Sequence, residues 1–557
     1  MTSTAWHNLG HQHHACAVKC RKNVQFDSSK MRWCFFCLFL RKNTIFKRIK
    51  ARNFWHENCT DCYKELSELE HRLSPQEVVM SRNVRGIHLM KSGMFASVWL
   101  LAILIMPLSV QAQEEISIGI GTQNTTTNTV TGGVVLKELK LLEKHLPRTG
   151  KYKNVKYKID WQNFTSGPPI TNGMMANRIH IGMMGDYPLL VNGATGQQQK
   201  GNETQLIAVL GYNLHGSGNG VVVHKDSPYY ELADLKGKNV SVPFGSAAHG
   251  MLLQAMQTRG WPENFWNLSS QSPEVGTTNI QEKRIDGHAN FVPFAELLPY
   301  RGFARKIFDG AETKVPTFHA VVVRKDFAEK YPEIVVAYVR AVMEANEWVR
   351  SNPRRAVEKI EEWTRIEKEV AYVFLGPNGV HTLDPSIKPV WIDTIRTAYS
   401  VLNKLGRVKD FNVEAWVNET YVKEAFKQQG LDYDKQKQTL AGYEISGQDS
   451  VCKTPVSRPK LAGEIWLDGG DILPISNANC VLVGIRQFAS QNKKVKVAYV
   501  MDQSLGIKLF ADKAYYVQSK EGVISPFLLK KDAEASAQKG GKLMSYEEAL
   551  QAAQIRK

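Results

Sequence analysis

From residue 116 onward, short apolar runs alternate with longer amphipathic segments, and this alternation restricts the fold more than any other feature of the chain. Apolar runs of about five residues favour buried strands, and the segments between them are long enough for helices. Strands separated by helices are typical of α/β domains with a mostly parallel sheet. The predicted strands are 116–120, 155–159, 179–184, 206–210 and 220–224, and two of the predicted helices are 134–145 and 332–350.

The pattern changes after residue 432. Residues 433–447 are polar and rich in Lys and Gln, which predicts a linker. A second, smaller unit follows at 448–557, with a last helix over 546–553 that Ser545 caps and that carries two Glu residues in its first turn. Its predicted strands are 463–467, 495–500 and 514–517.

An export signal precedes the first strand. Lys91 is followed by an apolar run over 95–110, which ends in small residues at Val110 and Ala112. A basic residue, a short apolar core and a small-x-small site are typical of a secretory signal peptide. Residues 90–112 are therefore predicted to be a signal peptide that is cut after Ala112, which places the mature chain in the periplasm.

Residues 1–89 do not fit in front of a signal peptide. We expect them to be a mis-called upstream extension, with Met90 as the true start. They hold six of the eight cysteines, including two C-x-x-C pairs, so a zinc module is the alternative hypothesis. These cysteines are Cys16, Cys20, Cys34, Cys37, Cys59 and Cys62.

The basic charge of the chain is unevenly distributed. The net charge is +17, and residues 1–112 contribute +9 of it through 16 Lys/Arg and 7 Asp/Glu, which leaves +8 for 113–557. No block of Lys and Arg with interleaved aromatics stands out in that remainder, so we expect a solvated surface and no nucleic-acid partner.

One run carries a specific resemblance. Residues 234–249 read DLKGKNVSVPFGSAAH and resemble the middle of the nitrate/sulfonate/taurine-binding-protein family. The resemblance extends over about 115–432 through 285–288, 321–326 and 347–353. It implies a two-lobed α/β fold of the periplasmic-binding-protein type II over 113–432, with a hinge and an interlobe cleft. It also implies a solute-binding component of an ABC importer that delivers a small molecule to a membrane permease, without a cofactor and without enzyme activity.

The candidate ligand-binding residues follow strand ends, where ligands of open α/β sheets bind. A helix N-terminus after one of these strands adds backbone donors that favour an anion. Three structural alternatives to ligand binding stay open. Ser246 is only a helix cap, the Thr run is only a polar loop, or Asp186 is a helix cap. The predicted residues are Gln123, Asn124, Thr125, Thr126, Met184, Asp186, Tyr187, Gly245, Ser246, His249, His288 and Asn290.

The chain departs from the sulfonate-binding pattern at 286–293, which reads DGHANFVP. Two tryptophans of that pattern are replaced by His288 and Phe291. The three histidines His249, His288 and His319 are either structural or together form a cationic or metal-chelating pocket. The predicted ligand is a small anion or zwitterion whose exact identity the sequence leaves open.

Residues 448–553 resemble NosL, a copper-chaperone accessory family of nitrous oxide reductase, through 495–502, 511–517 and 532–548. Soft sulfur ligands suit Cu(I), and Cys452, Cys480 and Met501 are weak candidates for them. The C-x-x-C-G-M and G-P-M-G motifs of that family are missing. In an oxidising compartment we favour a disulfide between the two cysteines.

Two other functions stay open. A periplasmic metal-delivery or respiratory accessory protein is supported only by the NosL-like unit. A pyrimidine-forming enzyme on the same scaffold is disfavoured, because the fungal proteins of that kind carry a cysteine-rich motif and this chain has no cysteine between residues 63 and 451.

Overall fold

The computed structural model describes residues 114–440 and 442–555. The predicted signal peptide and the upstream segment with its six cysteines lie outside the described residues. Among the helices of the described ranges, none combines the length and the hydrophobicity needed to cross a membrane.

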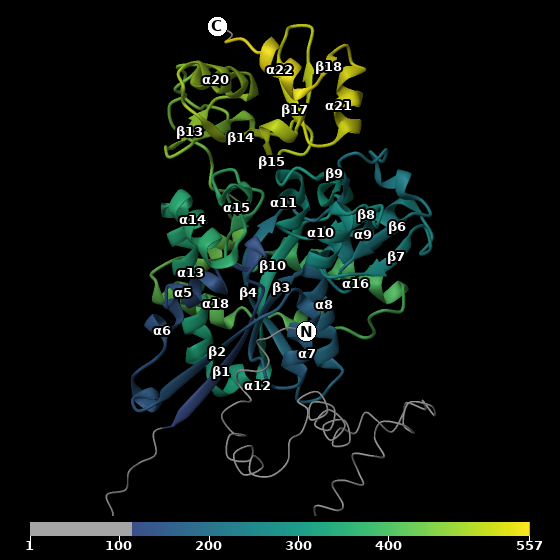
Figure 1. The fold of residues 1–557 in the computed structure, drawn as a ribbon. Helices are drawn as coiled ribbons and strands as arrows, with labels where there is room; N and C mark the ends of the chain where they lie inside the picture. The colour runs from purple at the N-terminus through teal and green to yellow at the C-terminus, as the bar shows by residue number, and fades with distance from the viewer. Residues whose placement is uncertain (1–113, 441, 556–557) are drawn as a thin grey trace, which may run out of the picture. The chain divides into compact units, whose positions relative to one another are not determined.

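A six-stranded sheet organises the first lobe, in the order β11-β4-β10-β3-β1-β2 (Figure 1). β1, β2 and β3 are parallel, and β10 runs antiparallel to both β3 and β4. The central strands β3 and β10 are buried along their whole length, whereas the edge strand β2 has no fully buried position. Buried apolar runs are typical of strands that helices cover on both faces. The strands are β1 (Glu115–Thr122), β2 (Lys156–Asn163), β3 (Ile181–Gly185), β4 (Thr204–Asn213), β10 (Thr317–Arg324) and β11 (Thr382–Leu383).

The helices of this lobe differ from the prediction in one place. The expected helix 134–145 is split into α5 (Val134–Glu138) and α6 (Leu141–His145), because Lys140 adopts a left-handed conformation with φ 52° and interrupts the ladder of hydrogen bonds. The long helix expected at 332–350 is α13 (Pro332–Ser351). The others are α7 (Gly167–Met175), α8 (Asp186–Gln197), α12 (Lys325–Lys330), α14 (Pro353–Thr364), α15 (Lys368–Leu375), α16 (Pro389–Lys404), α17 (Val413–Trp416), α18 (Thr420–Gln428) and α19 (Tyr433–Gln438), the last of which lies in the expected linker.

The second lobe repeats the topology of the first. Its sheet has the order β7-β6-β8-β5-β9, with β5 antiparallel to both β8 and β9. Thus β6, β7, β8, β9 and β5 take the places of β1, β2, β3, β4 and β10. The chain crosses between the lobes twice, at 214–219 and 310–316, which gives the predicted two-lobed fold with a hinge. The elements are β5 (Gly220–His224), β6 (Asn239–Val242), β7 (Asn267–Ser270), β8 (Gly287–Asn290), β9 (Ala304–Asp309), α9 (Ala247–Arg259), α10 (Pro273–Gln281) and α11 (Phe294–Tyr300).

The C-terminal unit has two small antiparallel sheets, β13-β12-β14-β15 and β17-β16-β18. The last helix begins after Ser545, whose hydroxyl accepts from the Glu548 amide in a capping box, as the sequence predicts. The elements are β12 (Gly463–Leu467), β13 (Ile472–Ile475), β14 (Val495–Met501), β15 (Lys508–Phe510), β16 (Tyr515–Gln518), β17 (Ile524–Phe527), β18 (Lys542–Met544), α20 (Ala478–Ser490), α21 (Lys530–Ala537) and α22 (Tyr546–Ala552).

A buried ion pair of the C-terminal unit accepts a hydrogen bond from α15. Lys508 Nζ lies 2.5 Å from Glu464 Oε2, and the Tyr372 hydroxyl of α15 donates to Glu464 Oε1 at 2.8 Å. The Lys508 side chain is fully buried.

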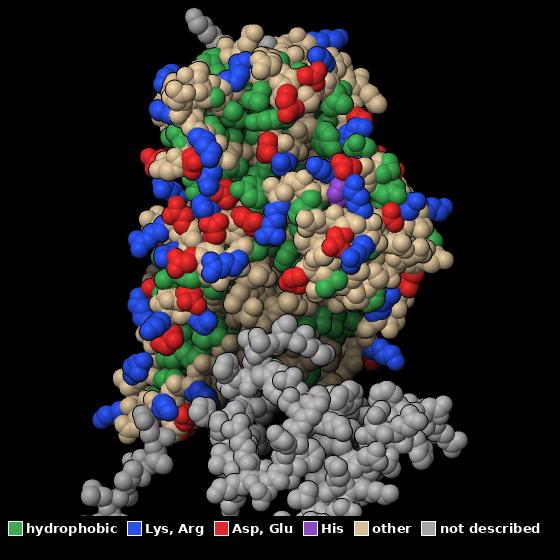
Figure 2. Space-filling view, in the orientation of Figure 1, with side chains coloured by type: hydrophobic (Ala, Val, Ile, Leu, Met, Phe, Trp, Pro, Cys, Tyr) green, Lys and Arg blue, Asp and Glu red, His purple; other side chains and the backbone are tan. Residues whose placement is uncertain are grey.

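Acidic and basic side chains are interspersed on the face of the molecule that Figure 2 shows, in agreement with the expected solvated surface.

Candidate ligand-binding site

The two lobes approach each other where β3 of the first lobe ends and α9 of the second lobe begins. A Cβ atom built on Gly185 would lie 3.0 Å from the Cβ of Ala247 and 3.2 Å from His319 Nε2. A Cβ atom built on Gly245 would lie 2.8 Å from Cγ of Pro168. Glycine at these two positions allows the backbones of the lobes to come close. The carboxyl-end loops of both sheets therefore face each other, as the sequence predicts.

The N-terminus of α9 offers free backbone donors. Ser246 is the N-cap, and its Oγ accepts a hydrogen bond from the His249 amide at 3.3 Å. The Gly245 amide donates to His249 Nδ1 at 3.1 Å, so it is already used. The amides of Ala247 and Ala248 are buried and have no acceptor among the described residues. These two N–H groups, rather than that of Gly245, are available to an anion.

His249 and Tyr187 form an aromatic contact beside this helix end. The His249 ring stacks on Phe244 with centroids 4.9 Å apart and lies 5.7 Å from the ring of Tyr187 in the other lobe. Burial, together with the positive charge of Arg407, lowers the pKa of His249 to about 4. His249 is therefore neutral at physiological pH and does not supply a cation.

The loop after β1 contributes polar groups from the first lobe. Gln123 Nε2 donates to the carbonyl of Met183, so its amide is committed to the fold. The Thr126 hydroxyl and the Asn124 side-chain oxygen are buried and have no hydrogen-bond partner among the described residues. Thr125 is partly buried. Unpartnered buried polar groups are costly unless a ligand or water satisfies them, so we include this loop in the candidate site.

Asp186 and Met184 lie at the end of β3. Asp186 is the first residue of α8, whose N-cap is Gly185, so the predicted capping role of Asp186 is wrong. Its carboxylate accepts from the Thr317 hydroxyl at 2.8 Å and from the Tyr187 amide at 2.7 Å. Burial raises the pKa of Asp186 to about 6. Met184 is fully buried beside it.

His288 and Asn290 are held within the second lobe. The Ser241 hydroxyl lies 2.8 Å from His288 Nδ1, and Asn290 Nδ2 lies 2.9 Å from Nε2, so both ring nitrogens are engaged. A Cβ atom built on Gly276 of α10 would lie only 2.1 Å from the His288 ring. Burial lowers the pKa of His288 to about 4. The structure thus places this histidine against α10 and does not bring it together with His249 and His319.

Two polar residues of the cleft, Asn128 and His381, were not predicted from the sequence. Asn128 Nδ2 lies 3.1 Å from His319 Nδ1 and 2.9 and 3.0 Å from the two ring nitrogens of His381. All three side chains are buried. Next to His381, a Cβ atom built on Gly218 of the first hinge crossing would lie 2.6 Å from its Nε2. Because Asn128 is 191 and 253 residues away from the two histidines, no local motif signals the cluster.

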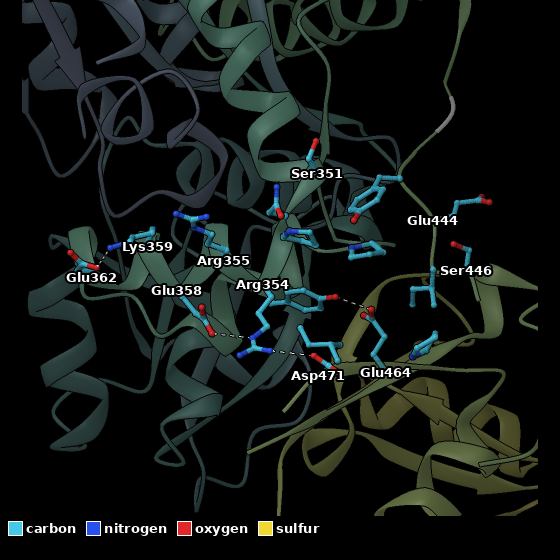
Figure 3. Close-up of a pocket in the computed structure, with 18 residues that line it drawn as sticks. Ser351, Arg354, Arg355, Glu358, Lys359, Glu362, Glu444, Ser446, Glu464 and Asp471 are labelled. Carbon is cyan, nitrogen blue, oxygen red and sulfur yellow. Dashed lines mark hydrogen bonds and ion pairs between the residues drawn. The ribbon is translucent and has the colours of Figure 1, made fainter. Parts of the chain in front are cut away.

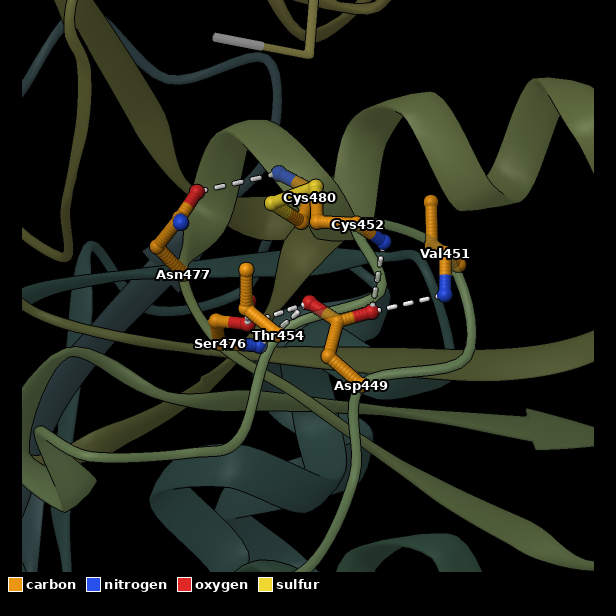
Figure 4. Close-up of a disulfide and its surroundings, with 7 residues drawn as sticks. All are labelled: Asp449, Val451, Cys452, Thr454, Ser476, Asn477 and Cys480. Carbon is orange, nitrogen blue, oxygen red and sulfur yellow. Dashed lines mark hydrogen bonds between the residues drawn. A yellow bond between two sulfur atoms is a disulfide. The ribbon is translucent and has the colours of Figure 1, made fainter. Parts of the chain in front are cut away.

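Two of the three weak metal-ligand candidates of the C-terminal unit, the cysteines, form a disulfide. Cys452 and Cys480 are bonded to each other, as predicted (Figure 4). Asp449 lies close to both sulfur atoms, but its carboxylate accepts hydrogen bonds from the amides of Cys452 and Ser476. Met501 is buried at the end of β14. In this oxidised form the cysteines have no thiolate to offer a soft metal.

A separate groove of about 1030 Å³ lies between α14 and β13. Arg354 spans it between Glu358 and Asp471, at 3.1 and 3.4 Å (Figure 3). Its walls also carry the buried Tyr372 and Glu464. Because the charged side chains that line the groove are largely paired with one another, we assign no ligand to it.

The sequence matches known proteins over the lobes. Residues 111–361 match the model of the NMT1-like family. The taurine-binding periplasmic protein of Escherichia coli (strain K12) is 32% identical over 199 residues, which cover 35% of this chain and 58% of that protein. A putative aliphatic sulfonates-binding protein of Bacillus subtilis (strain 168) is 22% identical over 283 residues, or 50% of this chain and 81% of that protein.

Among solved structures, the alkanesulfonate-binding protein SsuA from Xanthomonas axonopodis pv. citri, bound to MOPS, is similar with a TM-score of 0.47 and 18% identity. The match covers 56% of this chain and 100% of that one. The resemblance of residues 448–553 to NosL stays a prediction.

Proposed function

We propose that this chain is the extracytoplasmic solute-binding component of an ABC importer. It takes a small anion or zwitterion of the nitrate, sulfonate or taurine class into the cleft between its lobes and delivers it to a membrane permease. The names of the relatives, a taurine-binding periplasmic protein and a putative aliphatic sulfonates-binding protein, support this proposal. The predicted signal peptide supports a periplasmic location.

The observation that carries the proposal is the pair of unused amides at the start of α9. The N–H groups of Ala247 and Ala248 are buried, point out of a helix N-terminus and lie at the contact between the lobes. The positive end of a helix dipole and free amides together stabilise a bound anion. The hydroxyls of Thr126 and Ser246 add neutral donors. Tyr187 and His249 contribute aromatic surface next to them.

A binding protein fits this arrangement better than the two alternatives. The polar groups of the cleft are amides, hydroxyls, neutral imidazoles and the carboxylate of Asp186, which already accepts from Thr317 and from the Tyr187 amide, and this set suits capture without chemistry. The metal-delivery alternative needs free thiolates in the C-terminal unit, where the cysteines are joined in a disulfide. We therefore propose that the protein is not an enzyme and that its C-terminal unit does not deliver a metal through these cysteines.

Proline at the first position of α9 tests the site. Ala247→Pro removes one free N–H, and proline is tolerated at the first residue of a helix. The preceding residue must be extended, and Ser246 is, with φ −82° and ψ 168°. Binding of taurine, methanesulfonate and nitrate is measured by calorimetry. We expect the affinity for whichever probe binds to fall about ten- to a hundredfold, because a charge-assisted hydrogen bond is lost.

The matched control is Ala478→Pro in the C-terminal unit. Ala478 is also the first residue of a helix, α20, and follows an extended N-cap, Asn477, whose side chain accepts from the third amide of that helix. This variant has the same chemistry far from the cleft along the chain, and we expect unchanged affinity. Binding that Ala247→Pro leaves untouched would refute the placement of the anion at α9.

A further inference from the structure

The histidine–asparagine cluster of the cleft consists of Asn128, His319 and His381. Of these, only His319 was named from the sequence, as one of three histidines that are either structural or form a cationic or metal-chelating pocket. The cluster joins three distant parts of the first lobe: Asn128 after β1, His319 in β10, and His381 before β11. Each of these side chains is at least nine-tenths buried. Their mutual hydrogen bonds decide which atom of the cluster is left for a ligand.

The side-chain amide of Asn128 determines where the protons of the cluster lie. The amide is oriented with its NH₂ group toward the two imidazoles, and its oxygen faces the Thr127 hydroxyl at 3.5 Å. An NH₂ group only donates. His319 Nδ1, at 3.1 Å, must therefore accept, and the proton of the neutral ring is carried by Nε2. The second hydrogen of the NH₂ group is donated to the His381 ring.

The protonated nitrogen of His319 faces the other lobe. Nε2 has no hydrogen-bond partner among the described residues. It lies 3.2 Å from the position of a Cβ atom on Gly185, and Ala247 of α9 approaches the same position to 3.0 Å. Nε2 of His319 and the first residue of α9, through the Cβ of Ala247, thus approach the same point at the end of β3 from opposite lobes.

We propose that His319 is a ligand-binding residue whose Nε2–H donates a hydrogen bond to an oxygen of the bound oxyanion, with Asn128 as the positioning residue that holds the ring in this tautomer. The inference rests on the proposed function and narrows it. A group that receives only donors, from His319 and from α9, is an oxyanion such as a sulfonate or carboxylate. It is neither an ammonium group nor a metal ion, since a protonated Nε2 cannot ligate a metal.

Burial supports the neutral state of both rings. It lowers the pKa of His319 to about 3, and it lowers the pKa of His381 well below its usual value, aided by the neighbouring His319 and Lys306. Both imidazoles therefore stay neutral at the pH of the periplasm. The anion is held by uncharged donors on this side of the cleft.

The first test is the tautomer itself. The full chain is labelled with ¹⁵N-histidine, and the ¹⁵N shifts of His319, assigned with a His319→Gln variant, distinguish a protonated from an unprotonated ring nitrogen. We expect the proton on Nε2. In Asn128→Asp the new carboxylate accepts from Nδ1–H, so the proton should move to that nitrogen. A wild-type ring protonated on Nδ1 would overturn the inference.

The second test is affinity for taurine and methanesulfonate, measured by calorimetry. His319→Phe keeps the size of the ring but removes the donor, and we expect about a ten- to hundredfold weaker affinity. His319→Gln retains a neutral N–H donor, so we expect a smaller loss. His224→Phe, at the end of β5, is the matched control. Asn128→Asp should weaken binding as much as His319→Phe, with the melting temperature measured in parallel to exclude unfolding.

The outcomes separate the two proposals. If neither probe binds the wild-type chain, the proposed function for this ligand class is overturned, and the inference with it. If a probe binds wild type and His319→Phe equally well while Ala247→Pro loses affinity, only the inference is overturned. Stoichiometric Zn²⁺ binding that disappears in His319→Phe would also overturn it, because it would show Nε2 acting as a metal ligand.

Discussion

Removal of Glu464 should destabilise the C-terminal unit strongly. The Glu464→Leu variant leaves the ammonium group of Lys508 buried without its partner and the Tyr372 hydroxyl without an acceptor. Breaking a buried ion pair on one side costs about 3–5 kcal/mol. The triple variant Glu464→Leu, Lys508→Met, Tyr372→Phe replaces the whole network by apolar groups of similar size. We expect its local stability to lie within about 1 kcal/mol of wild type.

The assay is hydrogen–deuterium exchange of the amides of β12 and β14, which reports the local free energy of opening. Burial lowers the pKa of Lys508, while Glu464 opposes this shift. Without Glu464 the depression deepens, so the unfolded state binds more protons than the native state at neutral and mildly alkaline pH. The Glu464→Leu variant should therefore regain stability as the pH rises from 7 to 9.

The exposed pair between Lys494 and Asp468, 3.2 Å apart, is the control. An Asp468→Leu variant should change stability by less than about 1 kcal/mol. The reasoning is refuted if Glu464→Leu costs no more than this control, or if the triple variant is as unstable as the single one. Either result would mean that packing, and not the uncompensated charge, determines the stability of this contact.

Three further predictions concern other sites. Replacing Cys452 and Cys480 by serine should lower stability by about 3–4 kcal/mol, because the disulfide joins residues 28 apart; equal urea midpoints for variant and wild type would contradict this. Asp186 has a raised pKa in the native state. Its contribution to the free energy of unfolding is therefore fully present below about pH 4 and is lost as the pH rises through about 6. Melting temperatures of wild type should accordingly fall relative to Asp186→Asn over this range, and parallel curves would count against it. Ser246→Ala should cost about 1 kcal/mol as a lost helix cap, measured by thermal unfolding, and a loss above about 3 kcal/mol would show that Ser246 does more than cap α9.

The sequence predicted the elements that rest on local patterns. Apolar periodicity gave α13 almost to the residue, and a Ser followed three residues later by a Glu gave the start of α22. The break at Lys140 was not predicted, because nothing in the apolar pattern of 134–145 marks a residue in the left-handed conformation. Tertiary contacts select that conformation, and they are not visible in a local window.

The candidate site also has one part that local sequence predicts and another that depends on the tertiary fold. The α9 N-terminus follows from a strand, a glycine and a serine in sequence, and it was predicted in the right place. Which of its amides are free depends on the side chain of His249, which takes the Gly245 amide. The partnership of Asn128 with His319 and His381 depends on three distant segments of the fold, so it could not be read from spacing.

The contact of Gly276 with His288 has a consequence for how this sequence can change. Any side chain at 276 would occupy the space of the imidazole, with the first carbon only 2.1 Å from the ring. Conversely, a smaller residue at 288 would leave a void beneath α10 and would free the Ser241 hydroxyl. The two positions, twelve residues apart, are therefore expected to evolve as a pair. A tryptophan at 288 would need a different arrangement of α10, so we expect a histidine at 288 to occur together with a glycine at 276.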